Sequence, residues 1–379
     1  QGPPGTGKTH TGGHMICELV KQGKKVGIVA NGHDVIRNLL DKVIEVAEET
    51  ASPLVCIQKP KGGFKEEATD RLRFAKKSNA EVFAALNGDC GVAGGTAWLW
   101  STPDAFECLD VLFVDEAAQM SLANVLAVSQ AARTLVLLGD PQQLDQPMQG
   151  SHPDGTGCSA LDHLLSGKQT IGPDEGLFLD VTWRLHPDIS GFTSELFYEG
   201  KLESKEETAS QRVNASGIAG GTGLRFLPVE HKGNQNCSPE EADVIAAMVD
   251  DILQQGATWI DREGQEHPVG NDDILIIAPY NAQVFEIQQR LPQARVGTVD
   301  KFQGQEAPIS IYSLASSSHA DAPRGMEFLY SLNRLNVATS RAKCVTILVG
   351  SPQVFEAECR TPRQMQLANA FCRYREYAS

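Results

Sequence analysis

The sequence opens with Gln1-Gly2-Pro3-Pro4-Gly5-Thr6-Gly7-Lys8-Thr9, in which residues 2–9 fit the pattern G-x-x-x-x-G-K-[ST] without a mismatch. Gly5 and Gly7 let backbone N–H groups converge on a phosphate, because no Cβ stands in the way. The pattern that follows predicts a helix to Leu19, whose N-terminus adds a positive dipole end at the same place. The stretch therefore predicts a phosphate-binding loop, in which Lys8 reaches the β- and γ-phosphates and Thr9 binds Mg²⁺. The alternative is a Gly-Pro turn before an ordinary helix.

The composition is that of a globular protein with room for two domains, since 41% of the 379 residues are hydrophobic and 21% are charged. No apolar run approaches the length of a membrane span, and the N-terminus reads as a phosphate loop rather than a signal peptide. We therefore expect no membrane association and a cytoplasmic location. The nine cysteines are scattered singly without a C-x-x-C pair, which favours buried free thiols over disulfides or zinc.

The formal net charge of −15 argues against a protein that coats nucleic acid by bulk electrostatics. Local contact stays open. Between Lys59 and Lys77 there are seven basic residues against three acidic ones, with Phe64 and Phe74 among them. This stretch is either a nucleic-acid patch or a solvated helix face.

Strands and helices alternate along the first half, which predicts a mainly parallel sheet covered by helices on both faces. The expected strands are residues 26–30, 90–94, 111–114 and 135–138, the expected helices include residues 34–48, and residues 58–88 are expected to form a polar helical insertion.

Two of these strands run directly into polar residues. Residue 114 is followed by Asp115 and Glu116, and residue 138 by a Gly139-Asp140-Pro141-Gln142-Gln143 stretch. Because strand carboxyl ends meet at the crevice beside the phosphate loop, we expect Asp115 in the Mg²⁺ shell and Glu116 as general base for the attacking water. Gln143 would orient that water or sense the γ-phosphate. Each acidic pair alone could be a helix cap or a turn, but together with the loop the functional interpretation is much the stronger.

The second half repeats the α/β alternation without a phosphate loop of its own. We place the boundary between a domain of residues 1–168 and a domain of residues 176–379. The expected strands are residues 177–181, 224–227, 274–278, 309–314 and 344–349. One expected helix ends at residue 198, and the others span residues 239–254, 282–291 and 332–340. Residues 206–222 are polar and rich in Gly, Ala and Ser, which predicts a mobile surface loop.

Hydrolysis at a phosphate loop is slow without a cation that faces the γ-phosphate. The second half offers Arg184, in Thr182-Trp183-Arg184-Leu185-His186-Pro187, and Arg341, at the end of a predicted helix. If both arginines reach the nucleotide from the opposite domain, hydrolysis and domain closure become one event, as a motor requires.

The segments QGPPGTGKT, VDEAAQ, GDPQQL, TWRLHP, APYNAQ, TVDKFQGQE and RLNVATSRAK follow in this order. The set resembles motifs I to VI of superfamily 1 helicases, specifically the 5′→3′ branch. The segments GGTAWLWS and GSHPDGTGCSALDHLL look most like bacterial proteins that carry this helicase behind a RecB-like nuclease domain. The resemblance covers almost the whole chain. It implies two tandem RecA-like P-loop NTPase domains and an ATP-dependent helicase or translocase on single-stranded nucleic acid, with DNA favoured over RNA and an upstream nuclease domain in the full-length protein.

Two other functions remain as alternatives. A truncated helicase core could act only as a nucleotide or nucleic-acid binding module. A P-loop enzyme on a small molecule, such as a kinase, is disfavoured because the second half has a complete motif series and no evident acceptor pocket.

The resemblance also implies residue roles. Gln143 and Arg184 would lie at the γ-phosphate, Arg341 would be the arginine finger, Tyr280 would stack on adenine and Glu306 would accept from the ribose hydroxyls. The residues implied in ATP binding are Gly2, Pro3, Pro4, Gly5, Thr6, Gly7, Lys8, Thr9, His10, Tyr280, Gly304 and Glu306, with Thr9 and Asp115 for Mg²⁺.

Thr96 and Thr298 would contact the phosphodiester chain. Strand-end hydroxyl caps are an equal alternative for these two threonines, and a structural tyrosine is an alternative for Tyr280.

The sequence departs from the family pattern in three places. The family has a strand directly before the loop and an adenine-reading glutamine further upstream, and because neither is seen here we expect part of a longer protein, with weakened nucleotide affinity. Residues 30–33 lack the usual hydroxyl-rich motif Ia. His33 and His186 are interpreted as packing or capping residues. No metal-ligand cluster or nuclease carboxylate pair is visible, so nucleic-acid cleavage is not expected.

Overall fold

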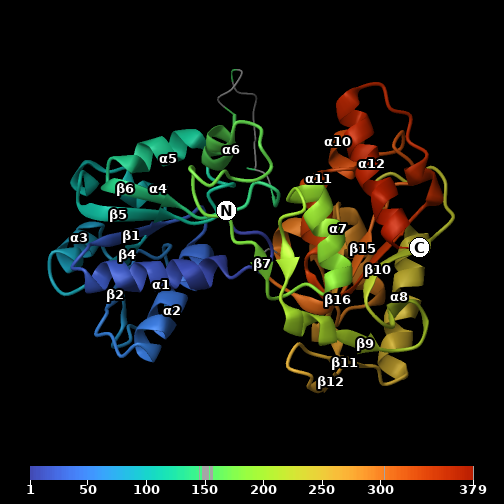
Figure 1. The fold of residues 1–379 in the computed structure, drawn as a ribbon, viewed down its shortest axis with the longest axis horizontal. Coiled ribbons are helices and arrows are strands. Elements are labelled where there is room, and N and C mark those ends of the chain that lie inside the picture. The colour runs from blue at the N-terminus through green and yellow to red at the C-terminus, as the bar shows by residue number, and fades with distance from the viewer. Residues whose placement is uncertain (145, 147–152, 154–156, 303, 379) are drawn as a thin grey trace. The chain divides into compact units, whose positions relative to one another are not determined.

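The computed structural model describes residues 1–144, 146, 153, 157–302 and 304–378, drawn as a ribbon in Figure 1. The described residues form two compact units, and the main division falls between Leu179 and Asp180. This division lies a few residues after the interval of 168 to 176 expected from the sequence. Residues 3–6 and 142–144 group with the second unit, although they precede the division. Most of the segment from residue 146 to 156, and Gln303, lie outside the described residues.

The sheet of the first unit has six strands, all parallel, in the order β3-β2-β4-β1-β5-β6. Their bounds are β1 Val26–Val29, β2 Cys56–Gln58, β3 Leu72–Phe74, β4 Val92–Gly94, β5 Leu109–Val114 and β6 Ala132–Leu137. The central strand β1 is buried along its whole length, as expected of a parallel strand covered on both faces. The predicted parallel α/β architecture is confirmed for this half.

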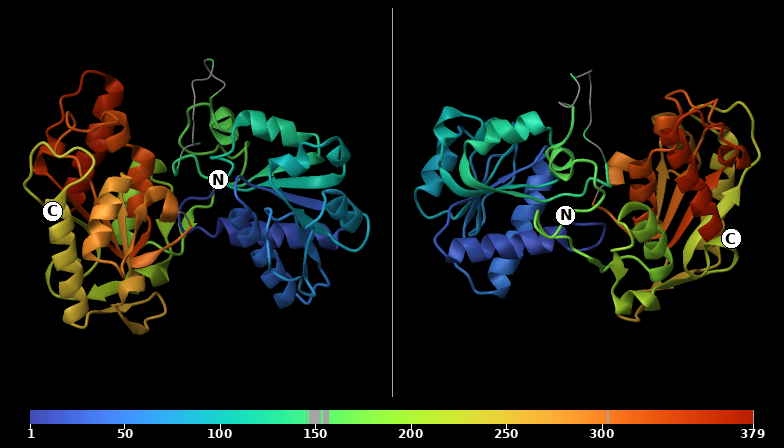
Figure 2. Two further views of the ribbon diagram at one scale, coloured as in Figure 1. Left: turned by 180° about the vertical axis from the view of Figure 1, so that it is seen from behind. Right: turned by 45° about the horizontal axis from the view of Figure 1, so that its top comes forward.

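Helices cover both faces of this sheet, as Figure 2 shows. Apolar residues of α1 (Lys8–Lys21) and α2 (His33–Glu49), such as Ile16 and Leu39, share one core with Val26 and Val111. The opposite core takes residues from α3 (Ala80–Leu86), α4 (Ala97–Trp100), α5 (Leu122–Ser129) and α6 (Ala160–Leu165). The alternating side chains of the strands thus feed two separate hydrophobic layers.

The predicted helical insertion at residues 58–88 is wrong in kind. Its middle forms the edge strand β3 and only its end forms the helix α3. The basic residues hold this segment to the unit: Arg73 forms an ion pair with Asp89 at 2.6 Å, and Arg71 donates to the carbonyl of Ser52 at 2.7 Å. Because these two arginines are paired within the unit, the structure favours a structural role for them, although not the helix face expected from the sequence.

The second unit contains a five-stranded parallel sheet in the order β10-β16-β15-β13-β14. Its strands are β10 Gly223–Pro228, β13 Ile274–Ala278, β14 Arg295–Thr298, β15 Ala307–Ser313 and β16 Ala342–Gly350. Residues Ile245 and Ile287 of α8 (Pro239–Gln254) and α9 (Asn281–Arg290) pack into the core beneath this sheet. The helices α7 (Pro187–Phe197), α11 (Leu332–Thr339) and α12 (Pro362–Tyr377) also contact it, and α10 (Met326–Leu329) precedes α11.

Two sequence expectations fail in this unit. The strand expected at residues 177–181 is reduced to β7 (Val181–Thr182), which pairs with β8 (Glu203–Ser204). The segment 206–222, expected to be a mobile loop, contains a 3-10 helix at Glu206–Ser210 and the strand β9 (Arg212–Asn214). This strand pairs with β11 (Thr258–Ile260), which pairs with β12 (Glu266–Pro268). Val213 is buried beside Trp259, and this contact explains the order despite a loop-like composition.

The nine cysteines are all free thiols, and Cys17, Cys56, Cys90 and Cys344 are buried. Within the described parts of the chain, no helix is long and apolar enough to span a bilayer.

Candidate functional site

The backbone of the phosphate loop has the geometry that its glycines allow. Gly5 and Gly7 have φ values of 72° and 77°, in the left-handed region. Gly7 is the N-cap residue of α1, and no side chain caps this N-terminus. The first N–H groups of α1 therefore face outward without a side-chain acceptor, an arrangement that fits an anion such as a phosphate.

In the first unit, Lys8 forms an ion pair with Glu116, and its Nζ lies 3.3 Å from Oε1 of that carboxylate. Burial alone would lower the pKa of Lys8, but the charges of Glu116, Asp115 and Asp140 outweigh burial and raise it. Lys8 is therefore a firmly charged ammonium group at the mouth of the loop. The sequence predicted the cation and two of these carboxylates.

Asp115 and Glu116 directly follow β5. Asp115 is buried, and burial together with the negative charge of Glu116 raises the pKa of its carboxyl to about 6, although Lys8 acts in the opposite direction. The Glu116 N–H donates to Oδ1 of Asp115 at 2.9 Å. Glu116 itself has a φ of 49°, a conformation that is costly for a residue with a side chain.

Asp140 is a site residue that the sequence interpretation left without a role. It follows the end of β6, is 1% exposed, and accepts a hydrogen bond of 3.4 Å from Nε2 of Gln1. Nearby, the Gly2 N–H donates to the carbonyl of Gly139 at 3.0 Å, which ties the start of the loop to the end of β6. The signal was present, since Asp140 follows an apolar strand as Asp115 does. Three carboxylates near one ammonium leave an excess of negative charge at the carboxyl ends of β5 and β6.

Thr96 and its neighbour Trp98 lie at the start of α4, after β4. Thr96 is the N-cap residue of α4, but its hydroxyl makes no capping hydrogen bond. Trp98 is 85% exposed, whereas Trp100 on the same helix is fully buried and donates to the carbonyl of Ile28 at 3.0 Å. The buried tryptophan anchors α4, so the exposed one is presented on a fixed support. The sequence analysis did not single out Trp98.

In the second unit, Arg184 is held against residues 3–6 of the loop. Thr182 Oγ1 donates to the carbonyl of Pro4 at 2.8 Å, and the Trp183 N–H donates to the carbonyl of Gly5 at 2.9 Å. A Cβ at Gly5 would lie 2.5 Å from Cβ of Arg184, so only glycine fits there. Within this unit, the predicted γ-phosphate arginine is thus fixed beside the tip of the phosphate loop.

The Arg184 guanidinium pairs with Glu306. Its Nε donates to the Glu306 carboxylate, which also lies 3.0 Å from Nζ of Lys343, and its Nη1 donates to the carbonyl of Ser340 at 3.2 Å. Partial burial would raise the pKa of Glu306, but the charges of Arg184 and Lys343 lower it to about 2. The carboxylate predicted to accept from the ribose is therefore already the acceptor for two cations. Gly304, two residues earlier, has a left-handed φ of 76°.

Gln143 and Arg341, predicted from separate motifs, meet in the second unit. Nη2 of Arg341 donates to Oε1 of Gln143 at 3.2 Å, and its Nη1 donates to the carbonyl of Gln305 at 3.2 Å. Arg341 is 1% exposed. Asn336 of α11 adds a hydrogen bond of 2.8 Å to the carbonyl of Gln142, so the polar segment 142–144 is bound to the helix that ends at Thr339, two residues before Arg341.

Tyr280 and Thr298 share one pocket of about 360 Å³ at the carboxyl ends of β13 and β14. Arg324 and Arg334 also line it, each with its guanidinium carbon 3.8 Å from the ring centre of Phe328. The structure thus places the residue predicted for adenine beside the residue predicted for the nucleic-acid chain.

The segment Pro3–Thr6 of the phosphate loop has an aromatic neighbour in Trp183. Its side chain is 47% exposed, and Nζ of Lys205 lies 4.8 Å from its ring. Its backbone N–H donates to the carbonyl of Gly5 at 2.9 Å, so Trp183 lies beside this part of the loop. Its place directly before Arg184 was the signal in the sequence.

Other predicted residues have simple positions. His186 caps α7, accepting at Nδ1 from the Asp188 N–H at 3.1 Å, which confirms the capping role expected for it. His10 is exposed on α1. Among the described residues, no group of three or more His, Cys, Asp or Glu side chains is arranged to hold a metal ion.

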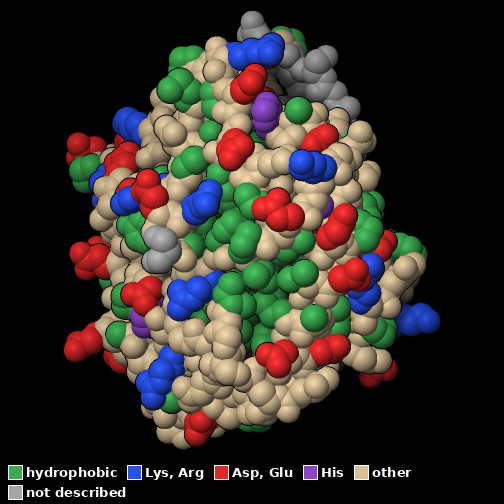
Figure 3. Space-filling view, turned by 90° about the vertical axis from the view of Figure 1, so that its right-hand side faces the viewer, with side chains coloured by type: hydrophobic (Ala, Val, Ile, Leu, Met, Phe, Trp, Pro, Cys, Tyr) green, Lys and Arg blue, Asp and Glu red, His purple; other side chains and the backbone are tan. Residues whose placement is uncertain are grey.

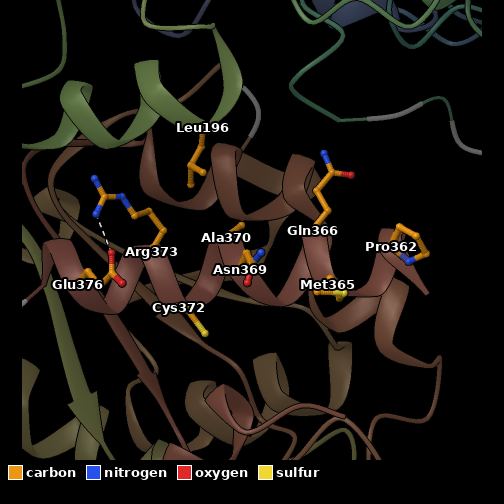
Figure 4. A pocket seen from close by; sticks show the side chains of 9 residues that line it. All are labelled: Leu196, Pro362, Met365, Gln366, Asn369, Ala370, Cys372, Arg373 and Glu376. Carbon is orange, nitrogen blue, oxygen red and sulfur yellow. Dashed lines mark hydrogen bonds and ion pairs between the residues drawn. The ribbon is translucent and has the colours of Figure 1, made fainter. Parts of the chain in front are cut away.

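A separate pocket of about 630 Å³ lies along α12, where Figure 4 shows Leu196 of α7 above a row of α12 side chains. Arg373 at one end forms an ion pair with Glu376 at 2.6 Å. None of the predicted site residues lines this pocket.

Figure 3 shows a face of the second unit on which hydrophobic side chains gather near the middle, with acidic and basic side chains scattered around them.

The chain is similar to known proteins over most of its length. The model of an AAA domain family matches residues 158–353, which is more than half of the chain, and a second AAA domain model matches residues 1–154. The DNA polymerase alpha-associated DNA helicase A of Schizosaccharomyces pombe is 24% identical over 92% of this chain and 60% of its own length.

The DNA replication ATP-dependent helicase/nuclease DNA2 of Gallus gallus is 30% identical over 92% of this chain and 34% of its own length. A solved complex of Arterivirus nonstructural protein 10 (helicase) with DNA has 14% identity and a TM-score of 0.49, covering 93% of this chain and 59% of that chain. The chain spans less than two thirds of the length of each of these proteins. With its two parallel sheets and its matches to two AAA domain models, the chain belongs to the AAA domain family.

Proposed function

We propose that this protein is an ATP-driven helicase or translocase that moves along single-stranded nucleic acid. The observation that carries the proposal is the cluster at the start of α1, where a charged Lys8 lies beside Glu116 and Asp115 next to a helix N-terminus that no side chain caps. This combination has the charges and donors that a nucleotide triphosphate with a divalent cation requires.

The residues of the first unit fit ATP and Mg²⁺ by their chemistry. Lys8 and the first N–H groups of α1 would bind phosphate oxygens, and Thr9 with Asp115 would hold Mg²⁺, which prefers oxygen ligands. Bound Mg²⁺ would neutralise part of the phosphate charge. Glu116 would take the proton of the attacking water. Its carboxylate must first be released from the ion pair with Lys8, and this would happen when phosphate oxygens bind Lys8 in its place.

The arginines of the second unit would supply the remaining positive charge. Arg184 is fixed by Glu306 and by the backbone of Ser340, and Arg341 by Gln143 and Gln305. Held side chains lose little freedom when charge develops on the γ-phosphate, and preorganised cations are the effective ones in phosphoryl transfer. That both reach the nucleotide stays a prediction.

Nucleic acid would be contacted by both units. In the first, the Thr96 hydroxyl and the exposed ring of Trp98 offer a phosphate donor and a stacking surface. In the second, Thr298, Arg324 and Arg334 line the pocket beneath Tyr280. Hydroxyls, arginines and aromatic rings without a base-reading pattern suit binding that is independent of sequence.

Finer features of the function rest on the motif resemblance. We propose DNA rather than RNA as the track, 5′→3′ movement, a cytoplasmic location, and a RecB-like nuclease domain in the full-length protein. The Gallus gallus relative is a helicase/nuclease, which supports the last of these.

The test measures ATP hydrolysis with and without single-stranded DNA or RNA. We expect stimulation by single strands, and in Glu116→Gln a loss of hydrolysis of at least about 100-fold with nucleotide binding retained. Glu49→Gln, at the exposed end of α2, is the matched control and should behave as wild type. Nucleotide binding without any hydrolysis in the wild type would instead support the binding-module alternative.

A further inference from the structure

Two histidines face each other on α1, immediately after the phosphate loop. His10 and His14 are separated by one helical turn, and both are exposed. Their Nε2 atoms are 3.2 Å apart, whereas their ring centres are 4.5 Å apart with the planes inclined by 55°. The rings therefore converge at their Nε2 corners instead of stacking flat.

This geometry fits a shared metal ion. Two nitrogens that bind one tetrahedral ion at about 2.0–2.1 Å lie roughly 3.3–3.4 Å apart, close to the separation seen here. Two histidines four residues apart on one helix face are a known way to hold zinc. A single N–H···N hydrogen bond between the rings would also fit the distance, but it would join two exposed side chains and gain little over water.

Acidic and basic side chains surround the pair. Glu45 of the neighbouring helix α2 is close enough to His10 for their charges to interact, and it forms an ion pair with Lys42 at 2.5 Å. Glu18 continues the same face of α1, four residues after His14. Figure 1 shows α1 and α2 packed side by side. A Cβ at Gly13 would lie only 3.1 Å from Cγ of Lys42, so the glycine allows the close approach that brings Glu45 near the pair.

We propose that His10 and His14 form a binding site for a divalent transition-metal ion of the zinc, nickel and copper class. Imidazole nitrogens suit these ions, whereas Mg²⁺ takes oxygen ligands, so the site is chemically distinct from the Mg²⁺ site proposed at Thr9 and Asp115. Two protein nitrogens bind the ion, and water completes its coordination. The ion would link His10 to His14 within the first two turns of α1, beginning one residue after Thr9.

The experiment uses the nucleotide-free protein without a histidine tag and titrates it with Ni²⁺ by calorimetry. We expect one ion per chain, and at least a ten-fold loss of affinity in His14→Ala and in His10→Ala. His163→Ala, which removes another exposed histidine on α6, should leave the affinity unchanged. Because His14 is exposed, its variant should keep the wild-type thermal unfolding profile, which separates metal loss from misfolding.

Two further readouts distinguish the site from its competitors. Electron paramagnetic resonance with one equivalent of Cu²⁺ should report two imidazole nitrogens in wild type and fewer in His14→Ala. The nine free cysteines could also bind these ions, and thiolate ligands would show as a charge-transfer absorption band that imidazole ligands lack. Equal Ni²⁺ affinity in His14→Ala, a thiolate band at the first equivalent, or displacement of Ni²⁺ by excess Mg²⁺ would each overturn the proposal.

Discussion

Asp115 is a residue of the candidate site whose buried charge lowers the stability of the folded protein at neutral pH. Its folded-state pKa of about 6 lies above the ordinary value of 3.8, because burial and Glu116 disfavour its charge. The folded protein therefore holds this proton more tightly than the unfolded chain does. The contribution of this proton to stability is therefore full below pH 3.8, falls as the pH rises toward 6, and is lost at neutral pH.

We predict that Asp115→Asn stabilises the protein at pH 7.5 by roughly 1–2 kcal/mol, because the uncharged amide avoids the cost of a buried charge. The gain should shrink as the pH is lowered toward 4. Urea unfolding midpoints without nucleotide or Mg²⁺ at both pH values measure this, with the exposed Asp70→Asn as control. A variant that is less stable than wild type at pH 7.5 would contradict the argument.

Glu306 allows two residue roles to be separated. If its main task is to position Arg184, Glu306→Gln should lower kcat by about 10- to 100-fold and change KM little, because a misplaced cation affects mainly the transition state. If it accepts from the ribose, as the motif resemblance implies, KM should rise instead. Steady-state ATPase assays decide between these, and Glu327→Gln on the exposed side of α10 should match wild type in both constants. An unchanged kcat would remove the positioning role.

At the scale of one element, α1 depends on glycines in its interior. Replacing a helix-interior glycine by alanine usually stabilises a protein by about 0.5–1 kcal/mol. A Cβ at Gly12 would lie 2.9 Å from Cδ1 of Leu138, a side-chain end that would have to shift, so we predict that Gly12→Ala stabilises by less than the usual amount. At Gly191 of α7 the nearest atom would be 3.9 Å away, so Gly191→Ala should stabilise by the usual amount. Thermal unfolding of both variants tests the contrast, and equal shifts would contradict it.

The sequence was most informative where the pattern was long and apolar. The helix predicted at residues 239–254 and the strand at 274–278 agree with α8 and β13 in full, because their apolar spacing continues over the whole element. The strands β9, β11 and β12 escaped prediction because each has three residues, too few for an alternating pattern to appear. Their order comes from the burial of Val213 and Trp259, which are distant in sequence.

The candidate site shows the same limit. The loop, Asp115 and Glu116 could be found because each motif is contiguous, and Lys8 does pair with Glu116. The pairing of Glu306 with Arg184 and Lys343 joins residues more than 30 positions apart, and no local spacing encodes it. The same holds for Tyr280, which lines one pocket with Thr298, Arg324 and Phe328 only because the folded sheet brings these distant residues together.

At the scale of the whole molecule, a formal net charge of −15 opposes the approach of a polyanion. The binding to nucleic acid that we propose would then depend on a few local contacts, such as those offered by Arg324 and Arg334 beside Thr298. For single strands, each neutralised phosphate contributes about −0.7 to the slope of the logarithm of affinity against the logarithm of salt concentration. A protein that uses two or three such contacts has a shallow slope, unlike one that coats the strand with basic residues.

We therefore predict a slope of about −1.5 to −2 for single-stranded DNA of one length, with its affinity measured by fluorescence anisotropy over a series of salt concentrations. The slope should become shallower by about 0.7 in Arg324→Gln or Arg334→Gln. Arg363→Gln removes an exposed arginine of α12 outside the pocket and should leave the slope unchanged. Both pocket arginines stack on Phe328, so each variant is first checked for wild-type thermal unfolding. A steep slope that neither variant alters would show that the strand is bound elsewhere, because the counterions released would then come from contacts that do not involve this pocket.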